Sequence, residues 1–340
     1  MKYTEKYLSD LTRIAARVPN IQRLSGSRIL ITGAGGLICS ALVDFLMKLE
    51  LDIQVYAAGR DPEKLKERFS HWQSAPNLHY VRYDALEPLA LDMPMDFLIH
   101  GASNASPKAY ATQPVETMLA NFTGMHNVLE YAKDSHSRGV LYVSSSEVYG
   151  RKDNAELYGE AEYGFVDILN PRACYPCSKR AAETLCAAYT AQFGLRTVIV
   201  RPGHIYGPTA TAHDDRASSQ FPRDVLAGKD IIMKSAGSQL RSYCYVLDCV
   251  SAMVTVLLDG QTAEAYNISN PDSVVTIRQM AEGFAQAAGR RIVFENPSDV
   301  EVKSYNLMDN SALDAQRLMN LGWKGLFDLS AGVAATLDAM

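Results

Sequence analysis

A glycine-rich segment near the N-terminus sets the strongest limit on what this chain can fold into. Residues 29–39 read ILITGAGGLIC, an apolar run followed by a glycine turn and then by a second apolar run. In a strand–turn–helix unit, such glycines allow a tight turn and let backbone N–H groups approach a pyrophosphate at the helix N-terminus. We therefore predict a dinucleotide site at Gly33 and Gly36. The third position of the spacing is Cys39 instead of glycine, which fits by size but is expected to need a local adjustment.

After this unit, segments with the patterns of strands and of helices alternate along the chain. The expected strands are 28–32, 53–58, 78–83, 97–101, 140–144 and 197–201. The expected helices are 39–49, 62–69, a long helix through Asn121 to Lys133, and 176–193. Such alternation predicts an α/β fold, in which a doubly wound parallel sheet carries helices on both faces.

The two ends of the chain depart from this alternation. After Pro202 the sequence turns to loops, short strands and terminal helices, which predicts a smaller mixed α/β region that binds the substrate. Residues 3–21 carry apolar side chains at helical spacing and are expected to pack on the main body or on a partner subunit. The expected domains are 1–22 as a helical extension, 23–201 with a contribution from 240–272 as the dinucleotide-binding domain, and 202–239 with 273–340 as the substrate domain.

Charge and hydropathy exclude several classes of function. The 340 residues include 33 basic and 38 acidic ones, giving a net charge of −5, and no basic run is interleaved with aromatic residues, so nucleic acid is not an expected partner. The first six residues are charged and unlike a signal peptide, and no apolar stretch approaches the ~18–20 residues that a membrane helix needs. The sequence therefore predicts a soluble, cytoplasmic protein.

The six cysteines lack the spacing of a disulfide framework, as expected in a reducing compartment. Cys174 and Cys177 form a C-x-x-C pair, but a zinc site would need a second ligand pair at suitable spacing, and the sequence has none. We expect no metal site. The pair is interpreted as two buried or half-buried thiols, with a redox switch that disables Tyr175 as the alternative.

Of the 18 tyrosines, Tyr175 alone is followed by a lysine four residues later, Lys179. On a helix these two positions share a face, so the phenol and the ammonium would meet. A free tyrosine has a pKa of about 10, and a fixed positive charge nearby would lower this pKa into the range useful for acid–base catalysis. Pro176 is expected at the first helical position, which would put Tyr175 near the N-cap.

The second expected strand ends without the acidic residue that usually binds the ribose 2′-hydroxyl of NAD. Arg60 stands near its tip. A basic residue accommodates the 2′-phosphate of NADP, or Arg60 stacks on the adenine, so both cofactors are compatible with these residues. Asp84, just after the third strand, is a candidate to bind the adenine amino group, with a plain helix-capping role as the alternative.

Two further stretches complete a recognisable pattern: VSSSEVYG at 143–150 and RPGHIYGP at 201–208. Together with the glycine turn and the Tyr175–Lys179 pair, they resemble the extended short-chain dehydrogenase/reductases that act on nucleotide sugars, over nearly the whole chain. The resemblance implies a Rossmann-like fold, Ser145 as the catalytic hydroxyl, and Asn121 on the helix behind the site. The expected cofactor-binding residues are then Gly33, Gly36, Leu37, Ile38, Arg60, Asp84, Ala102, Tyr175 and Lys179.

Within that superfamily the chain is most similar to the UDP-glucuronate decarboxylases, also called UDP-xylose synthases. The similar stretches are 101–110, 170–175, 215–221 and 237–243. The resemblance implies that Arg241 holds the diphosphate or acts near the sugar and that the loop from Arg216 cradles the nucleotide base. Arg172 is a further substrate-binding candidate, and each arginine has a solvated surface charge as its alternative.

Two positions depart from that family's pattern. His204 stands where these enzymes usually carry asparagine, close to the expected diphosphate, and residues 235–237 read SAG instead of a common Gly-Asp-Gly. Either departure could mean a different nucleotide or sugar. His204 could also be a simple packing residue.

The resemblance implies oxidation of the sugar at C4, with Tyr175 taking the hydroxyl proton, and Glu147 then decides what becomes of the ketone. A C4 ketone makes a C5 carboxylate a β-keto acid, which loses CO2. The same ketone would let a glutamate remove the C5 proton in a 4,6-dehydratase, but the residue before Glu147 is Ser146, too weak an acid for the departing hydroxyl. Decarboxylation is therefore favoured, with 4-epimerisation as the main alternative and dehydration behind it.

Two other functions are weighed against these. A ketone reductase using free NADPH is supported by Arg60 but leaves the phosphate motif ending at Arg241 unexplained. A catalytically silent, dinucleotide-sensing relative would be expected to lose the Ser/Tyr/Lys set, which is present.

Small and apolar residues on the helices around Asn121 and after Pro176 look exposed, and in the family such helices pair into a four-helix bundle, so a homodimer is expected. The helix-face residues named for this are Ala181, Ala182, Leu185, Ala188 and Tyr189.

Overall fold

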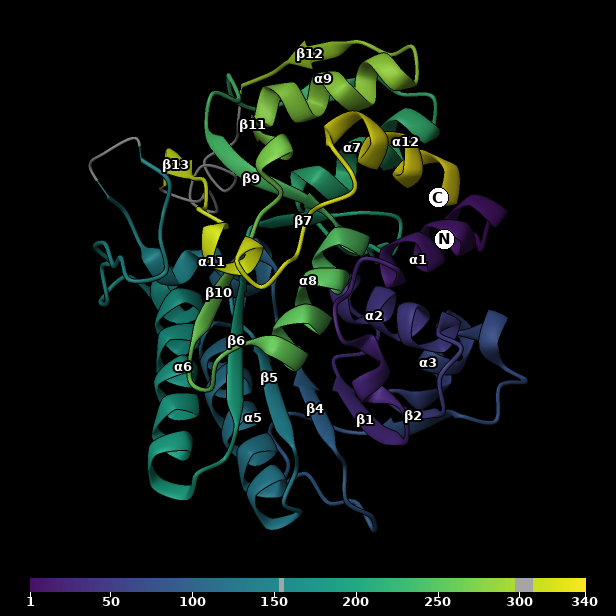
Figure 1. The fold of residues 1–340 in the computed structure, drawn as a ribbon. Coiled ribbons are helices and arrows are strands. Elements are labelled where there is room, and N and C mark those ends of the chain that lie inside the picture. The colour runs from purple at the N-terminus through teal and green to yellow at the C-terminus, as the bar shows by residue number, and fades with distance from the viewer. Residues whose placement is uncertain (153–155, 297–307) are drawn as a thin grey trace.

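A seven-stranded parallel sheet forms the centre of the protein (Figure 1). The computed structural model describes residues 1–152, 156–296 and 308–340. Across the sheet the strand order is β10-β6-β5-β4-β1-β2-β3, and every neighbouring pair runs parallel. The strands are β1 (Ser27–Thr32), β2 (Ile53–Gly59), β3 (Leu78–Arg82), β4 (Phe97–His100), β5 (Gly139–Val143), β6 (Thr197–Pro202) and β10 (Ala265–Ile268). The predicted α/β doubly wound fold is confirmed.

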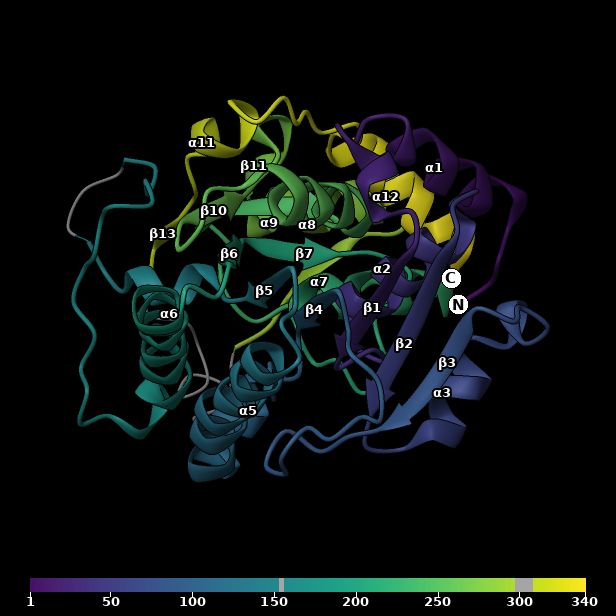
Figure 2. The same ribbon diagram turned by 60° about the horizontal axis from the view of Figure 1, so that its bottom comes forward.

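Helices cover both faces of this sheet, as Figure 2 shows. Their bounds are α2 (Leu37–Lys48), α3 (Pro62–Arg68), α5 (Pro114–Asp134), α6 (Cys174–Phe193) and α8 (Val246–Asp259). The pair α5 and α6 packs on one face and α2 with α8 on the other. Because both faces are covered, all five residues of β5 and all six of β6 are buried.

The order of the strands reverses between β1 and β4, which are neighbours in the sheet although β2 and β3 intervene in sequence. At such a switch point the loops after the two strands diverge and leave a crevice at the carboxyl ends, where α/β folds bind their ligands. The glycine turn follows β1, and residues 101–110 follow β4. The fold therefore brings these two stretches to one crevice.

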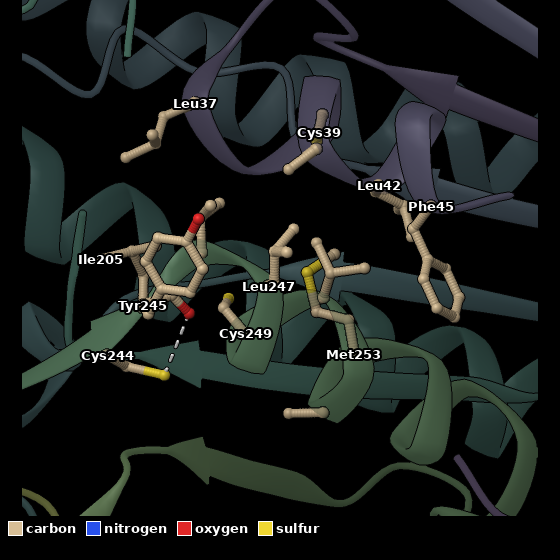
Figure 3. Packing of buried hydrophobic residues seen from close by; sticks show 14 of the residues in the cluster. Leu37, Cys39, Leu42, Phe45, Ile205, Cys244, Tyr245, Leu247, Cys249 and Met253 are labelled. Atoms are coloured by element: carbon tan, nitrogen blue, oxygen red, sulfur yellow. Dashed lines mark hydrogen bonds between the residues drawn. The ribbon is translucent and has the colours of Figure 1, made fainter. Parts of the chain in front are cut away.

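The largest hydrophobic core lies between the sheet and the α2–α8 layer (Figure 3). On α2, Leu42 and Phe45 are fully buried, and they face the α8 layer that carries Leu247, Cys249 and Met253. Nearly all of α8 is buried, so its sequence is apolar on every side instead of showing a helical stripe.

Smaller sheets follow β6, in the region that the sequence analysis described as mixed α/β. β9 (Leu240–Tyr245) is their centre: it pairs in parallel with β7 and β13 and antiparallel with β11. The remaining elements here are β7 (His204–Tyr206), β8 (Ile231–Met233), β11 (Val274–Thr276), β12 (Ile292–Phe294), β13 (Asn310–Ser311), α7 (Ala217–Leu226), α9 (Ile277–Ala287), α11 (Gln316–Met319) and α12 (Leu329–Ala339). β12 pairs in parallel with β8.

The predicted N-terminal helix is present as α1 (Glu5–Ala15), followed by a short 3-10 turn at Ile21–Leu24. Thr4 caps α1 by accepting a hydrogen bond from the Tyr7 amide. The helix packs against α2, α8 and α12, so it lies on the main body. Within the described part of the chain, every helix is too short or too polar to cross a membrane.

Candidate active site

The glycine turn has the geometry that a dinucleotide-binding loop requires. Gly33 has φ of +69°, and a Cβ there would lie 2.8 Å from the backbone of Ala102, so both conformation and space call for glycine. Gly36 donates from its amide to the Gly33 carbonyl at 2.9 Å and is the N-cap of α2. No side chain caps this helix, so its first N–H groups face the crevice and are available to a pyrophosphate. The helix begins at Leu37, two residues before the predicted start at Cys39, so Leu37 and Ile38 lie in its first turn.

The structure accommodates Cys39 by having a glycine, Gly101, next to its thiol. A Cβ on Gly101 would lie 2.3 Å from Cys39 Sγ, so the missing side chain at 101 provides the space that the thiol fills. Cys39 is 3% exposed, and burial raises the pKa of its thiol to about 12, which leaves it neutral and unreactive. Cys39 therefore acts as a packing residue between β1, β4 and α2.

At the adenosine end, β2 ends at Gly59, and Arg60 is exposed with none of the ion pairs found in the described part of the chain. The neighbouring carboxylate, Asp61, is engaged as the N-cap of α3. Asp84 accepts a hydrogen bond from the Leu86 amide at 3.0 Å in a turn after β3, where the structure has no helix for it to cap. The roles of Arg60 and Asp84 toward a cofactor stay predictions.

Tyr175 and Lys179 both lie buried on α6, but the start of this helix differs from the prediction. The helix begins at Cys174, directly after a 3-10 turn at Pro171–Ala173, so Tyr175 is in the first turn and is not the N-cap. Pro176 is tolerated one residue later because amides of the first turn have no intrahelical acceptor. The proline that begins the helical segment is Pro171, which the prediction overlooked.

Lys179 faces both the tyrosine and the end of β5. Its Nζ donates to the Val143 carbonyl at 2.8 Å and lies 5.6 Å from the centroid of the Tyr175 ring. Burial lowers the pKa of Lys179 to about 7. Burial and then the charge of Glu147 raise the pKa of Tyr175, so the predicted lowering by Lys179 does not prevail.

Two hydroxyl groups partly offset this increase in the pKa of Tyr175. Hydrogen bonds with Ser145 and with Tyr110 lower the pKa of Tyr175, because a hydroxyl that donates to the phenolate stabilises its charge. Ser145 follows β5 and also accepts from the Glu147 amide at 3.1 Å, which fixes its side chain at the start of the 3-10 turn Ser146–Tyr149. The structure thus brings Ser145, Tyr175 and Lys179 together at the carboxyl end of the sheet, beside the glycine turn.

Tyr110 is a site residue to which the sequence analysis gave no role. It lies on α4 (Pro107–Thr112), its ring stacks on that of Tyr175 with centroids 4.5 Å apart, and the Arg172 guanidinium lies 4.6 Å from its centroid. The residue is 4% exposed. Tyr110 and Tyr175 are 65 residues apart, so their contact could not be predicted from sequence spacing. The sequence feature that pointed to Tyr110 was its position at the end of the 101–110 stretch after β4.

Glu147 is paired with Arg172. The guanidinium donates twice, from Nη1 at 2.9 Å and from Nη2 at 3.1 Å, to the two carboxylate oxygens, and both side chains are about four-fifths buried. The third donor, Arg172 Nε, is buried and has no hydrogen-bond partner among the described residues. This fork-to-fork pair borders a pocket with an empty volume of about 620 Å³, which is also lined by Phe165, Val166 and Pro176.

Asn121 is fully buried on α5 and donates from Nδ2 to Ser178 Oγ at 3.0 Å, while its buried Oδ1 has no hydrogen-bond partner in the described part of the chain. Ser178 precedes Lys179, so this bond joins α5 to the helix that carries the tyrosine. The described contacts of Asn121 are thus to the helix scaffold.

The three remaining substrate candidates lie on the elements after β6. Arg241 on β9 is 3% exposed and donates from Nη1 to the backbone carbonyls of Leu240 and Asp309. Arg216 is the N-cap of α7 and forms a bidentate pair with Asp214. His204 opens β7, and burial, followed by the charges of Arg241 and Arg216, lowers its pKa to about 3.

A second buried ion pair supports the end of β5, and the sequence analysis missed it. Arg201 is 2% exposed and donates to both oxygens of Glu183, one turn after Lys179 on α6. The same carboxylate accepts from Ser144 Oγ at 2.5 Å, next to Ser145. The pair therefore ties α6 and the end of β6 to the strand that precedes Ser145.

The C-x-x-C pair consists of free thiols. Cys174 is buried, with Sγ 3.9 Å from the Tyr110 carbonyl, and Cys177 is half-buried. Burial raises the pKa of both thiols, so neither is poised for thiolate chemistry.

Comparisons with known proteins agree with this geometry. The model of the NAD dependent epimerase/dehydratase family matches residues 29–269. UDP-glucuronic acid decarboxylase 1 of Xenopus tropicalis is 31% identical over 318 residues, 91% of this chain and 71% of that protein. UDP-glucuronic acid decarboxylase 3 of Arabidopsis thaliana is 36% identical over 255 residues, 75% of this chain and 72% of that protein. The solved UDP-glucuronic acid 4-epimerase from Bacillus cereus, in complex with UDP-glucuronic acid and NAD, has a TM-score of 0.77 at 22% identity, covering 92% of this chain and 98% of that one.

Proposed function

Because the chain belongs to the NAD dependent epimerase/dehydratase family, we propose that it is a nucleotide-sugar enzyme of the decarboxylase type, which converts UDP-glucuronate to UDP-xylose and CO2. The curated relatives cited above are UDP-glucuronic acid decarboxylases, and their similarity extends over most of the chain. The cofactor is NAD, held by the uncapped start of α2 and by the turn at Gly33.

The observation that carries this proposal is the ion pair of Glu147 and Arg172 beside Tyr175. With both carboxylate oxygens engaged by the guanidinium, Glu147 is poorly placed to act as a free base on the C5 proton, as dehydration would require. Decarboxylation needs no base at C5, because the bond to CO2 supplies the electron pair. The planar guanidinium of Arg172 is also suited to a sugar carboxylate, and its Nε has no partner.

Each residue of the site has a separate role in the proposed reaction. Tyr175 takes the proton of the C4 hydroxyl, and Ser145 orients that oxygen. Lys179 lies next to Tyr175 and is fixed there by its hydrogen bond to the carbonyl at the end of β5. NAD, when bound, would supply the hydride acceptor for oxidation at C4 and the hydride donor for the later reduction. The C4 ketone makes the substrate a β-keto acid, CO2 leaves C5, and the resulting enolate takes one proton at C5. Tyr175 then returns its proton to the C4 oxygen as the ketone is reduced.

The test has two parts. Mass spectrometry of the cofactor released by denaturation identifies NAD or, given Arg60, NADP. Incubation with UDP-glucuronate is then expected to release CO2 in step with formation of a UDP-pentose. If CO2 is absent but a neutral UDP-hexose is interconverted, or UDP-glucuronate is epimerised, the 4-epimerase replaces the decarboxylase.

A variant addresses the role of Glu147. We expect Glu147→Gln to reduce CO2 release by about 10²-fold or more, because the amide breaks the double ion pair and leaves Arg172 without its counterion. Reduction of the bound cofactor by substrate, followed by its absorbance, is expected to persist because Tyr175 and Ser145 are retained. Full activity of this variant would contradict the assigned role.

Further parts of the proposal concern the substrate and the assembly. Residues 202–239 and 273–340 bind the nucleotide sugar, although 297–307 lie outside the described residues.

The protein is a homodimer paired through α5 and α6. In support, α5 exposes four large apolar side chains at helical spacing, Val115, Met118, Leu119 and Phe122. On α6, Ala181, Leu185 and Ala188 are accessible, but Ala182 and Tyr189 are buried in the core and were wrongly expected on the exposed face.

A further inference from the structure

Lys179 carries an ammonium group in a buried position without an ion pair. The residue is 2% exposed, and it takes part in none of the ion pairs found among the described residues. In that part of the chain its Nζ has one hydrogen bond, to the carbonyl of Val143 at 2.8 Å. An ammonium away from water is costly unless other groups favour its charge, so the charge of Lys179 needs an explanation.

Two aromatic rings face this ammonium. Nζ lies 4.8 Å from the centroid of the Tyr142 ring and 5.6 Å from that of the Tyr175 ring, so Tyr142 is the nearer. A cation over a ring and within about 6 Å of its centroid is attracted by the negative face of the π-system, and the attraction is stronger where water is excluded. Tyr142 lies on β5 and is fully buried. Its ring therefore meets the condition under which this contact is strong.

The hydroxyl of Tyr142 does not explain why an aromatic residue stands here. It is buried and has no hydrogen-bond partner in the part of the chain that the structure describes, which costs free energy relative to phenylalanine. Opposite Tyr142 on β4, the ring of His100 lies 6.0 Å from it between centroids, with the planes 18° apart. His100 is itself fixed by a hydrogen bond between Nδ1 and Thr32 Oγ1 at 2.8 Å. The feature of Tyr142 that the structure uses is thus its ring.

The other titratable groups around Lys179 give its charge little support. On α6, Glu183 favours the charge, but both of its carboxylate oxygens already accept hydrogen bonds from Arg201. On α2, burial raises the pKa of the Cys39 thiol to about 12, so this group is neutral. On β4, burial, followed by the charge of Lys179, lowers the pKa of His100 to about 3, so the imidazole is neutral as well. Burial alone lowers the pKa of Lys179, to about 7, and a ring face would oppose this change.

We propose that the ring face of Tyr142 keeps the ammonium of Lys179 charged and holds it beside Tyr175, which makes Tyr142 a positioning residue of this site. Because the Tyr142 ring is fully buried, it acts through Lys179 and does not reach a ligand. The inference rests on the proposed function only for the use that the reaction makes of Lys179. The contact between ring and ammonium needs no substrate and can be measured without one.

The contact has a definite sign. A group that stabilises the ammonium raises the pKa of Lys179, so weakening the ring face should lower that pKa. For a contact shielded from water, the proton affinity of Lys179 is expected to fall by about tenfold when the attraction is removed. A larger share of the lysine is then neutral at neutral pH, and this share grows as the pH rises.

The experiment compares two rings of nearly the same shape and different electron density. The reference is Tyr142→Phe, which removes the hydroxyl and keeps the face. The test protein carries 3,4,5-trifluorophenylalanine at position 142, where fluorine withdraws electrons from that face. In NAD-saturated protein, NMR of lysine labelled with carbon-13 at Cε follows the protonation of Lys179 between about pH 5 and 10, and the signal is assigned by its loss in Lys179→Arg.

The matched control makes the same two changes at Tyr83. This residue belongs to the same hydrophobic cluster as Tyr142, its buried hydroxyl also lacks a partner among the described residues, and no cation of those residues lies over its ring. If the fluorinated protein does not fold, Tyr142→Leu takes its place, because leucine removes the ring face altogether.

We expect the fluorinated ring at position 142 to lower the proton affinity of Lys179 about tenfold relative to Tyr142→Phe, and the same ring at position 83 to leave it unchanged. In single turnovers with UDP-glucuronate, the rate of cofactor reduction in the fluorinated protein, divided by that of Tyr142→Phe, should fall as the pH rises from about 6 to about 8, with substrate affinity unchanged.

An unchanged proton affinity at Lys179, or an equal change caused from position 83, would overturn the inference. A lowered proton affinity with no change in the pH dependence of cofactor reduction would overturn the assignment of Tyr142 to the site. If Lys179 responds as expected but UDP-glucuronate does not reduce the cofactor in any of these proteins, the proposed function is wrong and the contact between ring and ammonium stands.

Discussion

At the residue scale, Cys39 and Gly101 show how a departure from a glycine motif is accommodated. The thiol occupies space that a side chain at 101 would need, so each residue makes the other possible. The two positions are 62 residues apart in sequence and meet because β1 and β4 are neighbours in the sheet. A motif read along the chain detects the substitution at 39 but not its partner.

This contact makes a quantitative prediction. We expect Gly101→Ala to lower the free energy of unfolding by about 1–3 kcal/mol, because its methyl group would lie 2.3 Å from Cys39 Sγ, and to weaken NAD binding at the adjacent turn. Cys39→Gly/Gly101→Ala should regain most of both losses. Urea unfolding and cofactor titration of the wild type, both single variants and the double variant check this. Additive effects, within about 0.5 kcal/mol, would show that the two positions are not coupled.

The candidate site was predictable where chemistry follows sequence spacing. Tyr175 and Lys179 are one helical turn apart, so this pair could be found from its spacing, whereas Ser145 was named through the family resemblance of the stretch that follows β5. The roles of Tyr110 and of Arg172, the partner of Glu147, could not be predicted in this way. Their contacts form only when the segments after β4 and before α6 fold onto each other. The pKa of Tyr175 also depends on burial, which no spacing reveals.

At the element scale, α1 is held on the main body by one buried carboxylate. Asp44 of α2 is fully buried and accepts hydrogen bonds from Tyr3, Tyr7, Arg68 and Trp72. Two of these donors belong to the N-terminal segment and two to residues that follow β2. The amphipathic pattern of residues 3–21 predicted a packed helix, but this polar anchor was not evident from the sequence.

We expect Asp44→Asn to destabilise the protein by about 3–5 kcal/mol, since it removes the buried counterion of Arg68 and replaces one acceptor oxygen with an NH2 donor that faces other donors. Local opening should appear as faster hydrogen exchange in α1 than in the strands of the central sheet. Glu63→Gln is a control, because its pair with Lys66 is exposed, and a change within about 0.5 kcal/mol is expected. Unchanged exchange in α1 of the Asp44 variant would contradict the anchor.

At the scale of the whole molecule, the alternation of strands and helices predicted six of the seven strands of the central sheet, and β10, which follows the end of the alternation, was not among the expected strands. Parallel strands connected through helices have few allowed orders, and short apolar runs define each strand. The arrangement around β9 was not predictable, because β7, β11 and β13 are two or three residues long and come from distant parts of the chain. His204 and Arg241 meet through this sheet, which is why their relation is visible only in the structure.

The exposed face of α5 leads to the last prediction, that the protein is a dimer at micromolar concentration. Val115, Met118, Leu119 and Phe122 are each at least 44% exposed and share one face of the helix, and a self-complementary contact of two such faces buries them around a twofold axis.

Light scattering of the wild type should therefore give about twice the chain mass of 37.4 kDa. We expect Phe122→Asp to give monomers, because the contact would have to bury a carboxylate without a partner, whereas the side chain is already 44% exposed in the single chain and folding should be unaffected. Phe294→Asp, at a phenylalanine on β12 that is 50% exposed, makes the same chemical change away from α5 and should remain dimeric. A monomeric wild type, or a dimer that survives Phe122→Asp, would contradict pairing through this face.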